Sequence, residues 1–124
     1  MQSVMIIEDD ADIARLLARH LDHHGRRSRV LSSGEEALSI LGNQEAALPD
    51  AVICDLGLPG ISGIEVVEAI RAAERTARLP VVLMSARCTM QDHAMALSAG
   101  ADEFFDKPLK LKALDEALTR LLAT

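Results

Sequence analysis

Four segments of the chain place charged or polar side chains directly beside runs of apolar residues. The acidic run Glu8–Asp10 follows MII, Asp55 ends VICD, Ser85 follows VVLM, and Lys107 precedes a proline in DKPL. Two carboxylates about 4 Å apart repel each other by about 4 kcal/mol at an effective dielectric constant of 20, so a cluster of acids favours a cation. Mg²⁺ prefers oxygen ligands and commonly joins carboxylates to a phosphate group. These residue types could therefore bind Mg²⁺ and accept a phosphoryl group.

Each of these segments also has an ordinary structural explanation. Glu8–Asp10 could cap a following helix, and Asp55 could form a turn with the glycine and Pro-Gly residues behind it. Ser85 could cap a loop, and Lys107-Pro108 could be a solvated turn. The functional interpretation is favoured because all four segments fall at the ends of successive predicted strands. Whether these side chains lie close together therefore depends on the predicted strands and helices.

Short apolar runs alternate with helical patterns along the chain. The predicted strands are Ser3–Ile7, Ser28–Leu31, Ala51–Cys54, Val81–Met84 and a short segment at Phe104-Phe105. Helices are predicted between them from apolar residues at helical spacing and from capping signals at Ser33, Ser62 and Thr89. A leucine stripe from 111 to 121 predicts the last helix. This order predicts an α/β fold, with a doubly wound five-stranded parallel sheet flanked by five helices.

Sites in an open parallel sheet lie outside the carboxyl ends of the strands. We therefore expect one edge of the sheet to collect Glu8–Asp10, Asp55, Ser85 and Lys107. Glu8, Asp9 and Asp55 give a charge of −3, which Mg²⁺ brings to −1 and Lys107 brings to zero. Such a site can receive a dianionic phosphoryl group.

The composition fits one globular domain and excludes several classes of protein. The 124 residues are 49% apolar and 26% charged, with a net charge of −6 and 2% aromatic residues. An acidic chain with few aromatic residues lacks the surface of a nucleic-acid-binding domain. No apolar run approaches the roughly 20 residues of a membrane span, and the N-terminus is not a signal peptide. Two cysteines, Cys54 and Cys88, predict a reduced, cytoplasmic protein without disulfides.

The motifs MIIEDD, DLGLPGISG, LMSAR and DKPL, in this order, resemble the receiver domain of two-component response regulators of the chemotaxis-regulator type. The resemblance covers essentially all of residues 1–124 and implies one receiver domain with a flavodoxin-like fold. It implies that Asp55 accepts a phosphoryl group from the phosphohistidine of a histidine kinase or histidine phosphotransfer protein. The chain would then be a signalling switch, not an enzyme beyond catalysing its own phosphorylation and dephosphorylation.

The resemblance also implies a role for each site residue. Asp9 and Asp55 would ligate Mg²⁺ directly, Glu8 would act through water, and Gly57 would contribute its backbone carbonyl. Lys107 would stabilise negative charge on the phosphoryl oxygens, and its bond to the following proline would be cis.

Two further residues would form the switch. The resemblance implies that the Ser85 hydroxyl turns toward the phosphoryl group while Phe104 moves inward, changing the face made by the fourth helix, fifth strand and fifth helix. Ser85 replaces the more usual Thr, and Leu109 stands where Phe is frequent. Positions 57 and 87, here Gly57 and Arg87, would tune the lifetime of the phosphoryl group.

The remaining cysteines and histidines are predicted to be passive. Cys54 should be a small buried apolar residue, while Cys88 lies in a loop near the site. The four histidines could suggest a metal or phosphorelay role, but the DHHG run is typical of a solvated helix end. They are His20, His23, His24 and His93.

Several alternatives stay open from the sequence. A haloacid-dehalogenase-like phosphatase needs a second Asp two residues after the nucleophile, where this chain has Gly57. A pseudo-receiver would lack the intact acidic and lysine positions. The chain could stand alone or be cut from a longer regulator with a DNA-binding or enzymatic output domain. The last helix could form a homodimer or be solvated along an outer face with a mixed set of charges, Lys110, Lys112, Asp115, Glu116 and Arg120.

Overall fold

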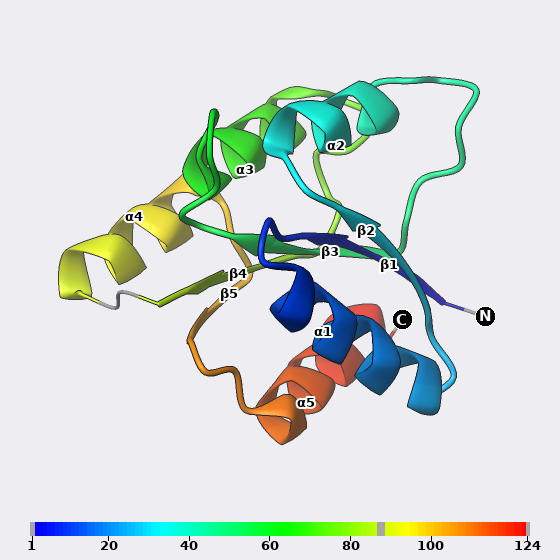
Figure 1. Ribbon diagram of the computed structural model, residues 1–124. Coiled ribbons are helices and arrows are strands. Elements are labelled where there is room, and N and C mark those ends of the chain that lie inside the picture. The colour runs from blue at the N-terminus through cyan, green and yellow to red at the C-terminus, as the bar shows by residue number, and fades with distance from the viewer. Residues whose placement is uncertain (1, 87–88, 124) are drawn as a thin grey trace.

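The computed structural model describes residues 2–86 and 89–123 (Figure 1). The elements in chain order are β1 Ser3–Ile7, α1 Ala11–His23, β2 Arg27–Leu31, α2 Gly34–Leu41, β3 Ala51–Asp55, α3 Gly63–Ala72, β4 Val81–Ser85, α4 Met90–Ala99, β5 Glu103–Asp106 and α5 Leu111–Leu122. Every predicted strand and helix is present. β3 and β4 each run one residue further than predicted, so Asp55 and Ser85 are the last residues of their strands.

The five strands form one parallel sheet in the order β2-β1-β3-β4-β5. Helices α1 and α5 cover one face, and α2, α3 and α4 cover the other (Figure 1). This confirms the predicted doubly wound α/β fold. The strand order reverses between β1 and β3, and ligands of such sheets bind at this switch point.

The central strands β1, β3 and β4 are mostly apolar because both of their faces are buried, whereas the edge strands β2 and β5 carry charged and partly exposed residues. In β1, Met5 and Ile7 pack toward α2 and α3, whereas Val4 and Ile6 pack toward α1 and α5. Full burial of such a side chain contributes about 1.5–3 kcal/mol. The two apolar layers therefore fix which way each strand faces, and with it the direction of the residue at its carboxyl end.

The helix ends follow the capping signals of the sequence. Ser62 and Glu65 form a complete capping box at the start of α3, and the side chains of Ser33 and Thr89 cap α2 and α4. Gly100 ends α4 in the left-handed region with φ of 115°, a conformation that glycine adopts without steric cost.

Two predictions about α1 and α5 were wrong. Asp115 does not belong to the solvated outer face of α5, because its carboxylate lies against the ring of His20 on α1, whose side chain is 15% exposed. Leu16, part of the apolar pattern of α1, is 55% exposed because the helix contacts the sheet along the neighbouring line of Leu17 and Leu21.

Both ends of the described chain lie beside the amino-terminal ends of the strands. β1 begins there, and α5 runs back to it from the side of the carboxyl ends (Figure 1). No helix among the described residues is long and apolar enough to span a membrane.

Candidate functional site

Three carboxylates meet at the carboxyl ends of β1 and β3, beside the switch point of the sheet. Oxygen atoms of Glu8, Asp9 and Asp55 lie within 4.8 Å of one another. Glu8 is 2% exposed and Asp55 6%, whereas Asp9 faces solvent. The structure therefore brings together the acids that the sequence placed at this edge, two of them buried and one accessible.

Lys107 supplies the cation of the group. Its Nζ lies 2.7 Å from Glu8 Oε1 and 3.2 Å from Asp55 Oδ1. Its backbone N–H donates to the carbonyl of Ser85 at 2.8 Å, which ties the end of β5 to β4. The Lys107–Pro108 peptide bond is cis, as predicted.

The electrostatics of the site follow from this packing. Burial raises the pKa of Glu8, and the hydrogen bonds from Lys107 and the Asp10 backbone only partly offset it. Burial lowers the pKa of Lys107, but its hydrogen bonds to Glu8 and Asp55 and the charges of both outweigh that effect and raise it overall. With Lys107 charged and all three acids ionised, the sum is −3 + 1 = −2, which a divalent cation would neutralise.

The three acidic residues after β1 make different contacts. Asp10 Oδ1 accepts hydrogen bonds from the N–H groups of Asp12 and Ile13 at 2.9 and 3.2 Å, which caps α1. The capping explanation is therefore correct for Asp10. Glu8 turns inward to Lys107, and Asp9 remains at the open side of the group.

The loop after β3 holds Asp55 in place by close backbone contact. The Leu56 N–H donates to the Met84 carbonyl at 2.8 Å, and the Gly63 N–H donates to the Leu56 carbonyl at 2.9 Å. A Cβ atom on Gly63 would lie 2.6 Å from the Asp55 carbonyl oxygen, so α3 can start this close only with glycine. Gly57, in contrast, is exposed, with none of the described atoms within 4 Å of where its Cβ would be.

The two predicted switch residues lie next to this group on β4 and β5. Ser85 is buried at the end of β4, opposite Asp106 in the sheet register. Phe104 is buried between the sheet and α4, and its ring centroid is 5.4 Å from that of His93. The ring of Phe104 is therefore packed against α4 in this structure.

Cys54 is fully buried on the α2–α4 side of the sheet, where burial raises the pKa of its thiol. This confirms the prediction that Cys54 is a small buried residue. Arg87 and Cys88, for which the sequence suggested a tuning role and a loop position, lie outside the described residues.

Arg71, which no sequence motif singled out, joins three segments near the amino-terminal ends of β4 and β5, away from the carboxylates. Its guanidinium forms an ion pair with Asp102 at 3.0 Å and donates to three backbone carbonyls, those of Ala77, Leu79 and Gly100. A basic residue in the last turn of a helix was the only signal in the sequence.

Comparison with known proteins identifies the family. Residues 4–119 match the model of the response regulator receiver domain. The chain belongs to this family. Among curated relatives, it is 38% identical over 122 residues to the transcriptional regulatory protein AfsQ1 of Streptomyces coelicolor. That alignment covers 98% of this chain but 52% of AfsQ1, so the chain spans about half the length of the curated relatives it matches.

Solved receiver domains have the same architecture. One is the signal receiver domain of a histidine kinase from Syntrophus aciditrophicus, with a TM-score of 0.89 and 27% identity over 98% of this chain and 90% of that one. Another is the receiver domain of a sensor histidine kinase from Pseudomonas aeruginosa, with a TM-score of 0.88 and 26% identity over 99% and 98% of the two chains. The latter structure has a magnesium ion coordinated in its active-site cleft.

Membership confirms the resemblance drawn from the four motifs, together with the flavodoxin-like fold. Receiver domains are signalling switches of two-component systems, and phosphorylation and Mg²⁺ binding are typical of the family. They are not enzymes in the ordinary sense.

Proposed function

We propose that this chain is a phosphorylation-activated switch in which Asp55 accepts a phosphoryl group from the phosphohistidine of a histidine kinase or histidine phosphotransfer protein. The observation that supports it best is the position of Asp55. Its carboxylate ends a buried strand and lies 3.2 Å from the Lys107 ammonium, beside two further acids. We further propose that residues 1–124 work as one receiver unit.

The transfer requires little covalent chemistry from the chain. A carboxylate oxygen of Asp55 attacks the phosphorus atom, the phosphorus–nitrogen bond breaks, and its electron pair leaves with the imidazole of the donor. Lys107 stabilises the negative charge on the phosphoryl oxygens, and catalysis of this kind is mostly positioning and charge stabilisation. When water attacks the same phosphorus, the bond between phosphorus and the Asp55 oxygen breaks, which frees the carboxylate and releases inorganic phosphate.

The residues present fit a Mg²⁺ ion. They offer oxygen donors only, within 4.8 Å of one another, and a net charge of −2 with Lys107 counted. Asp9 and Asp55 would hold the ion directly, Glu8 through water, and Gly57 through its carbonyl. When bound, the ion supplies positive charge beside the acceptor carboxylate and the phosphoryl oxygens.

The output would be a change on the face formed by α4, β5 and α5. Ser85 would turn its hydroxyl to the phosphoryl group, and Phe104 would move inward as Ser85 vacates space. This is a population shift between two packings. α4 itself exposes Met90 at 91%, together with Leu97, which suits docking of a partner protein, an output domain or a second copy of the chain.

The partner classes follow from the relatives. A curated relative at 34% identity over 113 residues is named the DNA-binding response regulator MtrA, and this chain covers 48% of it. We propose that any contact with DNA belongs to an output domain, because this chain is acidic with a net charge of −6. Phosphorylation by a histidine kinase also implies a cytoplasmic location.

The test is phosphorylation with acetyl phosphate and Mg²⁺, followed by mass spectrometry. We expect one acid-labile acyl phosphate per chain, lost in Asp55→Asn and retained in Asp22→Asn, a matched change on the exposed end of α1. Equal modification of Asp55→Asn would contradict the proposal. No modification combined with no Mg²⁺ binding would instead indicate a pseudo-receiver, and sustained hydrolysis of phosphate esters would indicate a phosphatase.

A further inference from the structure

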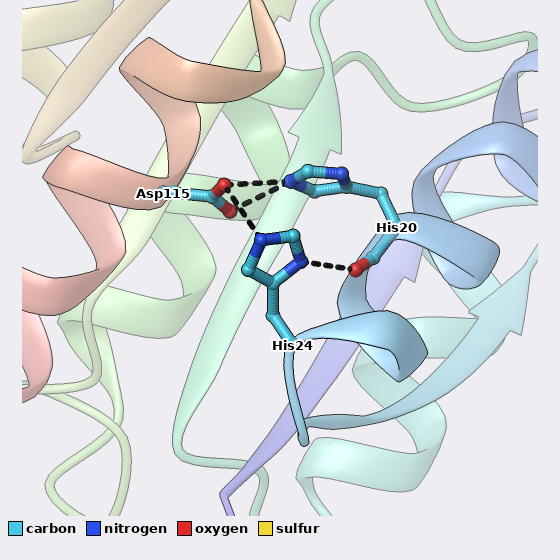
Figure 2. A group of neighbouring side chains, drawn as sticks. All are labelled: His20, His24 and Asp115. Atoms are coloured by element: carbon cyan, nitrogen blue, oxygen red, sulfur yellow. Dashed lines mark hydrogen bonds and ion pairs between the residues drawn. The ribbon is translucent and has the colours of Figure 1, made fainter.

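A second group of convergent side chains lies between α1 and α5 and shares no residue with the carboxylate site. His20 of α1 and His24, the residue that caps the carboxyl end of this helix, project toward Asp115 on α5 (Figure 2). His20 Nε2 lies 2.8 and 2.7 Å from the two oxygens of Asp115, and His24 Nε2 lies 3.6 Å from Oδ2. One donor atom from each residue lies within 4.8 Å of the other two.

Helix geometry explains why the two histidines act together. Residues four apart lie on the same face of a helix, one turn from each other. The ring centroids of His20 and His24 are 4.4 Å apart, so the pair forms a preformed two-point chelate. Asp115 supplies a third donor from the facing helix.

The hydrogen bond of His24 fixes which of its nitrogens can act as a ligand. His24 Nδ1 lies 2.9 Å from the backbone carbonyl of His20, and a carbonyl oxygen can only accept, so Nδ1 carries the proton (Figure 2). In neutral His24 the Nε2 lone pair then faces the Asp115 carboxylate. Two acceptors facing each other repel unless a cation lies between them. A histidine that binds a metal through one ring nitrogen usually donates a hydrogen bond from the other, as His24 Nδ1 does here.

The spacing suits a first-row transition metal. Zinc–ligand distances of about 2.0–2.2 Å put the donor atoms of a tetrahedral site about 3.3 Å apart. The contacts from Asp115 to His20 and His24, 2.7 and 3.6 Å, lie on either side of that value. His24 is 49% exposed, so water can complete the coordination.

We propose that His20, His24 and Asp115 bind a divalent transition-metal ion of the Zn²⁺ class, which links α1 to α5. Two imidazoles and one carboxylate are a donor set that suits Zn²⁺, whereas the all-oxygen group at Asp55 suits Mg²⁺. The chain would thus carry two cation sites of different chemistry. The zinc-type site does not depend on phosphorylation of Asp55.

The test is calorimetric titration with Zn²⁺ in millimolar Mg²⁺, which occupies the all-oxygen site, using a Cys88→Ser chain to remove an unrelated thiol. We expect one saturable Zn²⁺ per chain. His24→Gln should weaken binding at least about tenfold, as should His20→Gln and Asp115→Asn. His23→Gln is the matched control, because His23 ends the same helix outside the group, and it should bind as the parent does.

The alternative is that a proton alone bridges the three side chains. In that case the parent chain shows no saturable Zn²⁺ binding, or His24→Gln binds as tightly as the parent, and either result overturns the proposal. Because His24 is half exposed, its substitution should leave the fold intact, which unchanged Mg²⁺ binding checks. Zn²⁺ should also raise the melting temperature of the parent but not that of His24→Gln.

Discussion

At the scale of single residues, the carboxylate site carries an electrostatic conflict. Glu8 is almost completely buried, and desolvation raises the pKa of its carboxyl despite the ion pair with Lys107 at 2.7 Å. The folded chain therefore binds this proton more tightly than the unfolded chain does. The stability contributed by the raised pKa is complete below the unfolded value of about 4.3 and is lost as pH rises through the folded value.

We expect Glu8→Gln to be more stable than the wild type at neutral pH in the absence of divalent ions. The amide keeps the shape of the side chain but removes a buried charge that desolvation disfavours. The difference in unfolding free energy between the two proteins should grow as pH rises from 4 to 7. Urea unfolding in the presence of EDTA measures it.

The same substitution should weaken Mg²⁺ binding, because it takes one negative charge from the group. Mg²⁺ should therefore stabilise the wild type more than Glu8→Gln, by the linkage between ligand binding and folding. A variant less stable than the wild type at every pH would show that the ion pair with Lys107 outweighs desolvation.

At the scale of elements, the join between β3 and α3 sets the position of Asp55. The first residue of α3, Gly63, contacts the backbone of Asp55 and Leu56, whereas Gly57 in the intervening loop stands in open space. Two glycines six residues apart thus have different reasons to be there. One permits a close approach of backbones, and the other leaves room beside the acceptor.

We expect Gly63→Ala to destabilise the chain by about 1–3 kcal/mol, the usual cost of forcing atoms into a packed position. Its new Cβ would be 2.6 Å from the Asp55 carbonyl oxygen and 2.8 Å from the Leu56 Cα, so α3 would have to shift. Phosphorylation should slow as well, because Asp55 moves with its strand end. Urea unfolding and the rate of acetyl phosphate labelling measure the two effects.

Gly57→Ala is the matched control, with the same added methyl group in open space. It should change the unfolding free energy by less than about 0.5 kcal/mol. Equal destabilisation by both substitutions would show that the close contact at Gly63 is not what distinguishes them.

The elements and most of the site were predictable because their signals are local. Alternating apolar runs gave the strands, capping serines gave the helix starts, and the rule on strand ends placed Asp55 with Glu8. What the sequence did not reveal depends on contacts between distant segments. His20 pairs with Asp115, and Arg71 pairs with Asp102, across long separations in the chain. No sequence spacing marks these residues as paired, so each looks like an ordinary solvated polar residue in the sequence. The i, i+4 spacing of His20 and His24 was the one available hint.

At the scale of the whole molecule, the helices differ in how firmly they are held. α3 and α4 have ten residues each and comparable Ser or Thr caps. α3 buries Val66, Val67 and Ile70 along with Gly63, whereas Ala96 is the one buried residue of α4. The proposed output face is thus built on a helix with little apolar anchoring.

We expect the backbone amides of α4 to exchange with deuterium faster than those of α3, because local opening exposes less apolar surface there. Phosphorylation of Asp55 should change exchange in α4 and β5 and leave α3 nearly unchanged. Hydrogen exchange with mass spectrometry measures both, with α3 as the internal control. Equal protection of the two helices would argue against α4 as the adaptable element.

The direction of α5 has a practical consequence for attaching other groups to the molecule. Since β1 starts and α5 finishes beside the ends of the strands that are remote from Asp55, both ends of the described chain emerge away from the carboxylates (Figure 1). A fluorescent reporter or a surface tether fused at either end would leave the acceptor open to its donor. The chain could therefore be immobilised or labelled through either end and still be phosphorylated from solution.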